Sequence, residues 1–145
     1  MAIVGTDHTV MLVQDIEAGI TTYRDHLGLE LSHQVEHTEA GISQAFFALA
    51  DGTFLELIAP AGDNSRFDQV LNDNGEGVHV LALAVDDLDE SVAALQQQQV
   101  QLIGVGTPQV FIHPRSAHGA MIQLWPKDRP HRWRDSNDPV AAAQQ

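Results

Sequence analysis

The sequence predicts an α+β fold built from two β-α-β-β-β modules that repeat each other. Each half opens with a histidine and an apolar run, at His8 and at His79, and an aspartate follows each run, at Asp15 and at Asp87. The offset between the halves is 71 residues at the histidines and 72 at the aspartates. Similarity at a fixed offset indicates one structural unit that is used twice.

The first module is expected over about 6–59. Asp15 is placed to cap its helix, because a side-chain oxygen there accepts hydrogen bonds from the first free amides. Apolar residues then recur at spacings of three and four, which gives the helix one buried face: these are Ile16, Ile20, Tyr23 and Leu27. Strands are expected at about 30–36, 42–49 and 53–58. Asp51-Gly52 is typical of the hairpin turn before the last of them.

The second module is expected over about 78–126 and repeats this order. Asp87 precedes a helix whose apolar face holds Leu88, Val92 and Leu95. Its strands are expected at about 101–105, 109–112 and 120–125. A linker over about 60–77, with a short helix at about 66–72, joins the modules. Residues 127–145 are expected to form an extended tail, part of which Trp125 and Trp133 pack against the rest of the domain.

Composition excludes several classes of partner. The 145 residues include 7 Lys and Arg against 20 Asp and Glu, a net charge of −13, and 43% are hydrophobic, which is typical of one globular domain. This acidity excludes nucleic acid and anionic membranes, because both are bound through clustered cations. The chain has no cysteine, so it forms no disulfide or thiolate site. It shows no basic leader and no long apolar run, so a soluble cytoplasmic protein is expected.

Polar residues interrupt apolar strands at matching places in the two halves. Glu56 and Gln123 lie within the last predicted strand of each half, and His8 and His79 begin the first. A buried glutamate is costly unless it is paired or metal-bound, and imidazole nitrogens with oxygen donors suit a divalent metal. Each residue alone also fits an outward-facing strand position. As two related pairs, the four residues favour a metal site.

With these residues the chain resembles the vicinal oxygen chelate superfamily, which includes glyoxalase I, methylmalonyl-CoA epimerase and extradiol dioxygenases. The resemblance covers about 6–126. It implies two curved mixed sheets that enclose one divalent metal, Co, Ni, Mn, Zn or Fe, with ligands on the first and last strand of each half. Carried over to this chain, the ligand positions are His8, Glu56, His79 and Gln123.

Within the superfamily, three stretches resemble methylmalonyl-CoA epimerases: residues 53–60, 77–88 and 111–124. The last stretch contains a Phe-Ile-His-Pro-Arg run, in which Arg115 stands at a family lysine position and keeps the positive charge. The resemblance therefore implies that substrate is bound by Arg115, Ser116 and His113.

Two positions depart from the epimerase pattern. Gln123 replaces a glutamate that is both a ligand and a proposed base, and Gln44 replaces a second glutamate proposed as a base. An amide does not accept a proton at neutral pH. Glu56 is then the one clear carboxylate that the predicted site offers as a base.

The resemblance implies a metal-dependent epimerase or isomerase that transfers a proton on a small acyl or 2-oxo substrate, such as an acyl-CoA. A glyoxalase I-type lyase acting on a hemithioacetal uses similar chemistry and stays open. A non-catalytic binding protein of the bleomycin-resistance type also stays open, and the net charge of −13 suits it. A dioxygenase fits less well, because its glutamate ligand lies on the last strand, where this chain has Gln123. The family's common state is a homodimer.

Overall fold

The computed structural model describes residues 2–62 and 65–135, which divide into two compact units. One unit, named here the α1 unit, comprises Val10–Val78 and the residues from His131 onward. The other, the α3 unit, comprises the residues up to Thr9 together with His79–Pro130. Strands β1 (Ile3–Leu12) and β5 (Gly77–Val85) contribute residues to both units.

The α1 unit contains the first β-α-β-β-β module. Its strand order is β2-β3-β4-β1, with antiparallel pairing of β2 to β3 and of β3 to β4. Beside β1, the Val13 amide donates to the Ile58 carbonyl at 2.9 Å. After β1 the elements are α1 (Ile16–Ile20), η1 (Thr21–His26), β2 (Leu31–His37), β3 (Ile42–Ala48), β4 (Phe54–Pro60) and α2 (Arg66–Asn74).

The predicted helix after Asp15 forms, but its second half widens. The Asp15 carboxylate accepts hydrogen bonds from the amides of Glu17 and Ala18, at 2.8 and 3.1 Å, so the predicted cap is confirmed. Residues Thr21–His26 then form a π-helix, in which the Leu27 amide donates to the Thr22 carbonyl. A π turn holds an extra residue and rotates the side chains after it about the helix axis. Leu27, expected on the buried face, is therefore 62% exposed.

The α3 unit contains the second module. Its strand order is β1-β5-β8-β7-β6, and the sheet is mixed because β5 pairs with β8 in parallel while β7 pairs with β8 and β6 antiparallel. Asp87 caps α3 as predicted, accepting from the Glu90 amide at 2.9 Å. After β5 the elements are α3 (Leu88–Gln97), β6 (Leu102–Ile103), β7 (Val110–Ile112), η2 (Pro114–Ser116) and β8 (Ile122–Pro126).

Strand β6 is shorter than predicted. It covers two residues, because Gly104 and Gly106 both adopt positive φ angles, 79° and 88°. The Thr107 amide closes this turn by donating to the Gly104 carbonyl at 3.0 Å. Both halves nevertheless keep the order β-α-β-β-β, so the predicted α+β repeat is confirmed.

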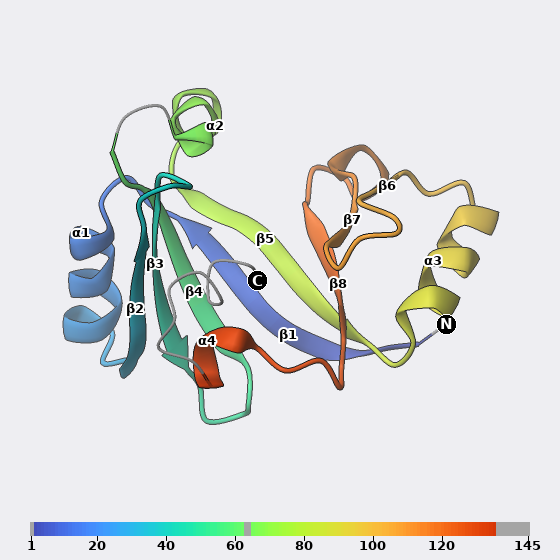
Figure 1. The fold of residues 1–145 in the computed structure, drawn as a ribbon, viewed down its shortest axis with the longest axis horizontal. Helices are drawn as coiled ribbons and strands as arrows, with labels where there is room; N and C mark the ends of the chain where they lie inside the picture. The colour runs from blue at the N-terminus through green and yellow to red at the C-terminus, as the bar shows by residue number, and fades with distance from the viewer. Residues whose placement is uncertain (1, 63–64, 136–145) are drawn as a thin grey trace. The chain divides into compact units, whose positions relative to one another are not determined.

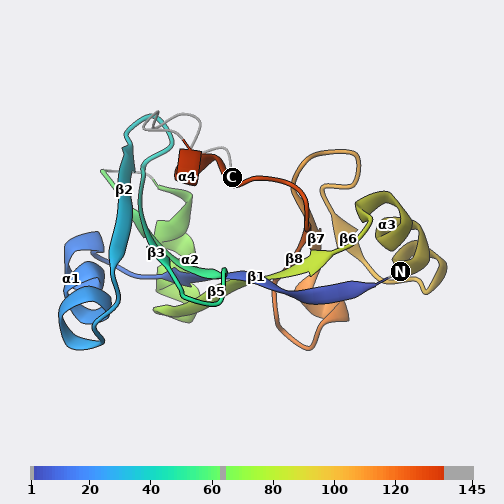
Figure 2. The same ribbon diagram turned by 90° about the horizontal axis from the view of Figure 1, so that it is seen from below.

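The structure describes the segment after β8 as far as Asp135. A short helix, α4 (Arg132–Asp135), packs on the α1 unit, and its Trp133 side chain is 1% exposed. The Trp133 ring stacks on Phe46 with ring centres 4.6 Å apart, which confirms that Trp133 pins part of the predicted tail. Helices α1 and α4 lie on opposite sides of β2–β4 (Figures 1 and 2). The rest of the predicted tail, residues 136–145, lies outside the described residues. No described helix is long and apolar enough to cross a membrane.

Candidate active site

In the α1 unit, Glu56 and Gln44 lie on the face of the sheet that points away from α1. The register pairs Phe46 with Glu56 and Gln44 with Ile58, so these four side chains share one face. The alternate residues, including Phe47 and Leu57, pack instead against Ile20 of α1. Glu56 is 6% exposed and Gln44 is 3% exposed. A carboxyl and an amide thus lie side by side, almost completely excluded from solvent.

Burial changes the acidity of the Glu56 carboxyl. Burial raises its pKa from 4.5 to about 7, although the hydrogen bond from Gln44 acts in the opposite direction. Gln44 Nε2 donates to Glu56 Oε2 at 3.2 Å. Gln44 Oε1 is also buried and has no hydrogen-bond partner within the described part of the chain. A carboxyl with a pKa near neutrality is suited to act as a general acid or base.

The segment from His131 to Arg134 covers the same face, where it packs on Phe46 and Phe54. The His131 ring meets Phe54 edge-on with ring centres 4.6 Å apart, and Trp133 lies 4.9 Å from Phe54. Arg134 donates to the Gly52 carbonyl at 3.2 Å. Phe54 and Glu56 are two residues apart on β4 and point the same way. Sequence reasoning assigned His131 to the tail, and only Trp133 signalled that this segment packs on the module.

In the α3 unit, His8 and Gln123 share a face. Gln123 is 5% exposed, and Trp125, two residues along β8, points to the same side. The His8 ring meets Trp125 edge-on, with ring centres 5.8 Å apart. Asp7 Oδ2 lies 2.6 Å from His8 Nδ1. Such a carboxylate favours a proton on Nδ1 and a lone pair on Nε2, the arrangement of many metal-binding histidines.

His79 does not join that face. Ala82 pairs with Gln123 in parallel register, so the side chains of Ala82 and Gln123 point the same way. His79 is three residues before Ala82 on β5, and side chains alternate along a strand, so His79 points to the other side. Val80 points with Gln123 instead. Of the predicted ligands, the α3 unit places His8 and Gln123 together, whereas Glu56 belongs to the α1 unit. The α3 unit therefore brings two of its three predicted ligands, His8 and Gln123, to one face.

The three predicted substrate-binding residues lie around η2, where two of them shape the turn. His113 Nδ1 accepts from the Arg115 amide at 3.0 Å. Ser116 Oγ accepts from the Gln101 amide, also at 3.0 Å. The Arg115 side chain is exposed. His113 and Ser116 thus fix the backbone of a loop that presents a single cation to solvent.

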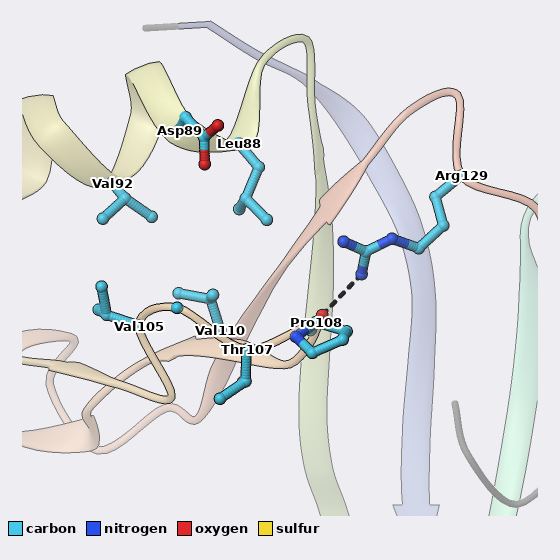
Figure 3. A pocket seen from close by; sticks show the side chains of 9 residues that line it. Leu88, Asp89, Val92, Val105, Thr107, Pro108, Val110 and Arg129 are labelled. Atoms are coloured by element: carbon cyan, nitrogen blue, oxygen red, sulfur yellow. Dashed lines mark hydrogen bonds between the residues drawn. The ribbon is translucent and has the colours of Figure 1, made fainter.

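A cavity of about 380 Å³ lies elsewhere in the α3 unit, between α3 and the loop before β7 (Figure 3). Arg129 closes one side, where its Nη1 donates to the Pro108 carbonyl at 2.6 Å. Val110 lines the cavity and pairs with Leu124, so the cavity is on the opposite side of the sheet from Gln123. None of the predicted site residues lines it.

Comparison with known proteins places these features in a family. The sequence matches the glyoxalase-like domain over residues 6–137. The methylmalonyl-CoA epimerase of Dictyostelium discoideum is 30% identical over 126 residues, which cover 81% of this chain and 75% of that protein.

Solved structures agree with this. The methylmalonyl-CoA epimerase of Mycobacterium tuberculosis superposes with a TM-score of 0.73 and 34% identity, over 88% of this chain and 90% of that one. A variant of the Streptomyces coelicolor enzyme, in complex with 2-nitronate-propionyl-CoA, superposes with a TM-score of 0.72 and 27% identity, over 88% and 100% of the two chains. These homologues support an epimerase-like function. The chain therefore belongs to the glyoxalase-like family of the vicinal oxygen chelate superfamily, with methylmalonyl-CoA epimerases among its homologues.

Proposed function

We propose that the chain is a proton-transfer enzyme of the epimerase type that acts on the carbon next to the carbonyl of an acyl-CoA thioester. The observation that supports this most is the buried Glu56–Gln44 pair, in which burial raises the pKa of Glu56 to about 7. A base whose pKa lies near the working pH is both unprotonated often enough and basic enough to remove a proton. A structural neighbour bound to 2-nitronate-propionyl-CoA supports the substrate class.

In the proposed step, the proton on the carbon next to the carbonyl moves to the Glu56 carboxylate. The electron pair of the broken C–H bond moves toward the carbonyl, and the carbonyl oxygen takes the negative charge. Glu56 becomes neutral as it accepts the proton, so the burial that disfavours its charged form also favours this transfer. Gln44 Nε2 holds the carboxylate in place through the hydrogen bond to Oε2. Return of the proton to carbon restores the carboxylate.

Inversion of the carbon requires a second group, which returns a proton to the other side. Gln44 and Gln123 occupy the positions where the family resemblance implies carboxylates, and an amide does not accept a proton at neutral pH. We therefore expect the chain to exchange the proton with solvent faster than it inverts the carbon.

Metal dependence is a further part of this proposal. His8 and Gln123 offer an imidazole and an oxygen donor that suit a divalent Co, Ni, Mn, Zn or Fe ion. When bound, such an ion would supply a positive charge that stabilises negative charge on a substrate oxygen. The exposed Arg115 is proposed to meet the phosphates of the CoA group. A homodimer and a cytoplasmic location stay predictions.

The test is solvent exchange in D₂O with each epimer of methylmalonyl-CoA. Proton NMR follows loss of the proton, and a stereospecific coupled assay follows inversion. We expect exchange to increase as the pH rises through about 7, as Glu56 loses its proton. If neither epimer exchanges its proton but the protein converts a hemithioacetal, the epimerase proposal is wrong and the chain is a glyoxalase I-type lyase.

Two variants separate the roles of the paired residues. Glu56→Gln should lower exchange by about 10²–10⁴-fold, which is the usual contribution of a general base. Gln44→Met keeps the volume of the side chain but removes the hydrogen bond that lowers the pKa of Glu56. Its exchange profile should therefore move to higher pH with little change in the maximum rate. An unchanged profile would show that Gln44 does not act on Glu56.

A further inference from the structure

We infer that the α3 unit presents a single imidazole to a metal ion, that of His8, and that Val80 occupies the place opposite it where a second imidazole would stand. His79, the residue that the sequence pattern suggests, is then not a ligand. The inference concerns the geometry of the α3 unit and does not depend on the proposed proton transfer. Three separate observations carry it.

The first observation is the register between β5 and β8. Their parallel pairing sets Ala82 beside Gln123. Val80 is two residues before Ala82, so it points to the same side, and it is 7% exposed. His79 points to the opposite side, toward which Leu124 of β8 also points. A shift of one residue thus decides which side chain faces Gln123.

The second observation is the pairing between β1 and β5, which run in opposite directions as neighbours (Figure 1). The Asp86 amide donates to the Ala2 carbonyl at 3.1 Å, at the ends of the two strands. Continued along both strands without interruption, this antiparallel pairing sets His8 opposite Val80. Residues opposite one another in such a pair point to the same side of the sheet.

The third observation is the repeat itself. Asp15 and Asp87 are the N-caps of the two helices, and each accepts from the amide three residues later, so these residues are structurally equivalent, at an offset of 72. The same offset carries His8 onto Val80. The two histidines are 71 residues apart, so His79 falls one position short of the equivalent place. Their likeness in sequence is therefore not an equivalence in structure.

The chemical consequence concerns metal affinity. Imidazole nitrogen binds Zn²⁺, Co²⁺ and Ni²⁺ better than an amide oxygen does. Val80 offers no donor atom, so β5 adds no ligand at this position to those that His8 and Gln123 offer on this side of the sheet. Substitution of Val80 by histidine would place a second imidazole opposite the first.

Metal titration tests this without any substrate. The double variant His79→Ala/Val80→His moves one imidazole by a single position and leaves the number of histidines unchanged. Zn²⁺ affinity is measured by calorimetry, and Co²⁺ coordination by visible absorption, for the full chain and for the double variant. We expect the double variant to bind Zn²⁺ about tenfold more tightly or better than the unmodified chain.

Two single variants complete the design. His79→Ala should leave Zn²⁺ affinity within about twofold of that of the unmodified chain, and His8→Ala should remove the gain when it is added to the double variant. The inference is overturned if His79→Ala alone lowers affinity about tenfold, or if the folded double variant binds no more tightly than the unmodified chain. Circular dichroism shows whether each variant folds. If the double variant does not fold, the Zn²⁺ affinity of His79→Ala alone tests the inference.

Discussion

The two modules share one order of elements and differ in the residues that they place on the face away from their helix. In the α1 unit, Glu56 pairs with Phe46 across β3 and β4, and Trp133 covers Phe46. In the α3 unit, Gln123 pairs in the same way with Phe111 across β7 and β8, and Phe111 is half-buried. One module therefore offers a desolvated acid, and the other offers a neutral amide. Duplication of a fold leaves each copy free to keep different chemistry at equivalent positions.

The packing of Trp133 should show the largest difference between the modules. Trp133→Ala removes a fully covered ring that contacts Phe46 and Phe54, so we expect the free energy of unfolding to fall by about 3–5 kcal/mol. Phe111→Ala, at the position of the other module that corresponds to Phe46, should cost less because Phe111 is half-buried. Urea denaturation measures the free energy of unfolding of both variants. An equal loss in the two would contradict the expected difference between the modules.

The buried acid should also make stability depend on pH. The pKa of Glu56 is about 7 in the folded chain against an ordinary value of 4.5 in the unfolded chain, so the folded state holds the proton more tightly. The resulting stabilisation is complete below pH 4.5 and is lost as the pH rises through about 7, to a total of about 3 kcal/mol.

Glu56→Gln should remove this part of the pH dependence, whereas Gln123→Ala in the other module should leave it in place. Urea denaturation of metal-free protein between about pH 4 and pH 8 provides the measurement. If both variants keep the slope, another group causes it.

A carboxyl can be given to the second module. Gln123→Glu restores the residue that the family resemblance implies, and we expect inversion of methylmalonyl-CoA to rise about tenfold relative to exchange, because a second group can then carry a proton. The stereospecific assay and proton NMR measure the two rates together. Loss of activity in this variant would show that Gln123 is fitted to different chemistry.

The helix caps should show the smallest difference. Asp15→Ala and Asp87→Ala each remove a side chain that accepts from helix amides, so each should lower the free energy of unfolding by about 1 kcal/mol. Thermal or urea unfolding measures both. A cost several times larger in one module would show that the two helices are not equivalent.

The sequence predicts those parts of the fold that depend on local signals. Capping aspartates, apolar spacing and the Asp51-Gly52 turn each act over a few residues, and the elements they predict are present. The buried Glu56 was predicted in the same way, because a charged residue within an apolar strand stands out. The family resemblance put both Glu56 and Gln44 in the predicted site but did not predict that they pair, and the structure brings the two into contact.

Features that depend on register or on distant packing were not predicted. The face on which His79 lies changes with a shift of one residue, and the sequence offers offsets of both 71 and 72. The π turn before Leu27 adds a residue that no local signal marks. His131 reaches its place through Trp133, whose partners Phe46 and Phe54 are far away in the sequence.

Each unit combines residues that lie far apart in the sequence, so neither unit can finish folding until its last segment has been synthesised. The α1 unit needs Trp133, which is made 55 residues after Val78, and the α3 unit needs β1 residues made long before its other strands. At roughly 5–20 residues per second, Phe46 and Phe54 wait several seconds for their covering ring. A nascent chain in this interval presents an uncovered aromatic surface. Chaperone binding to ribosome-bound chains should therefore persist until residues 131–135 have emerged, and cease soon afterwards.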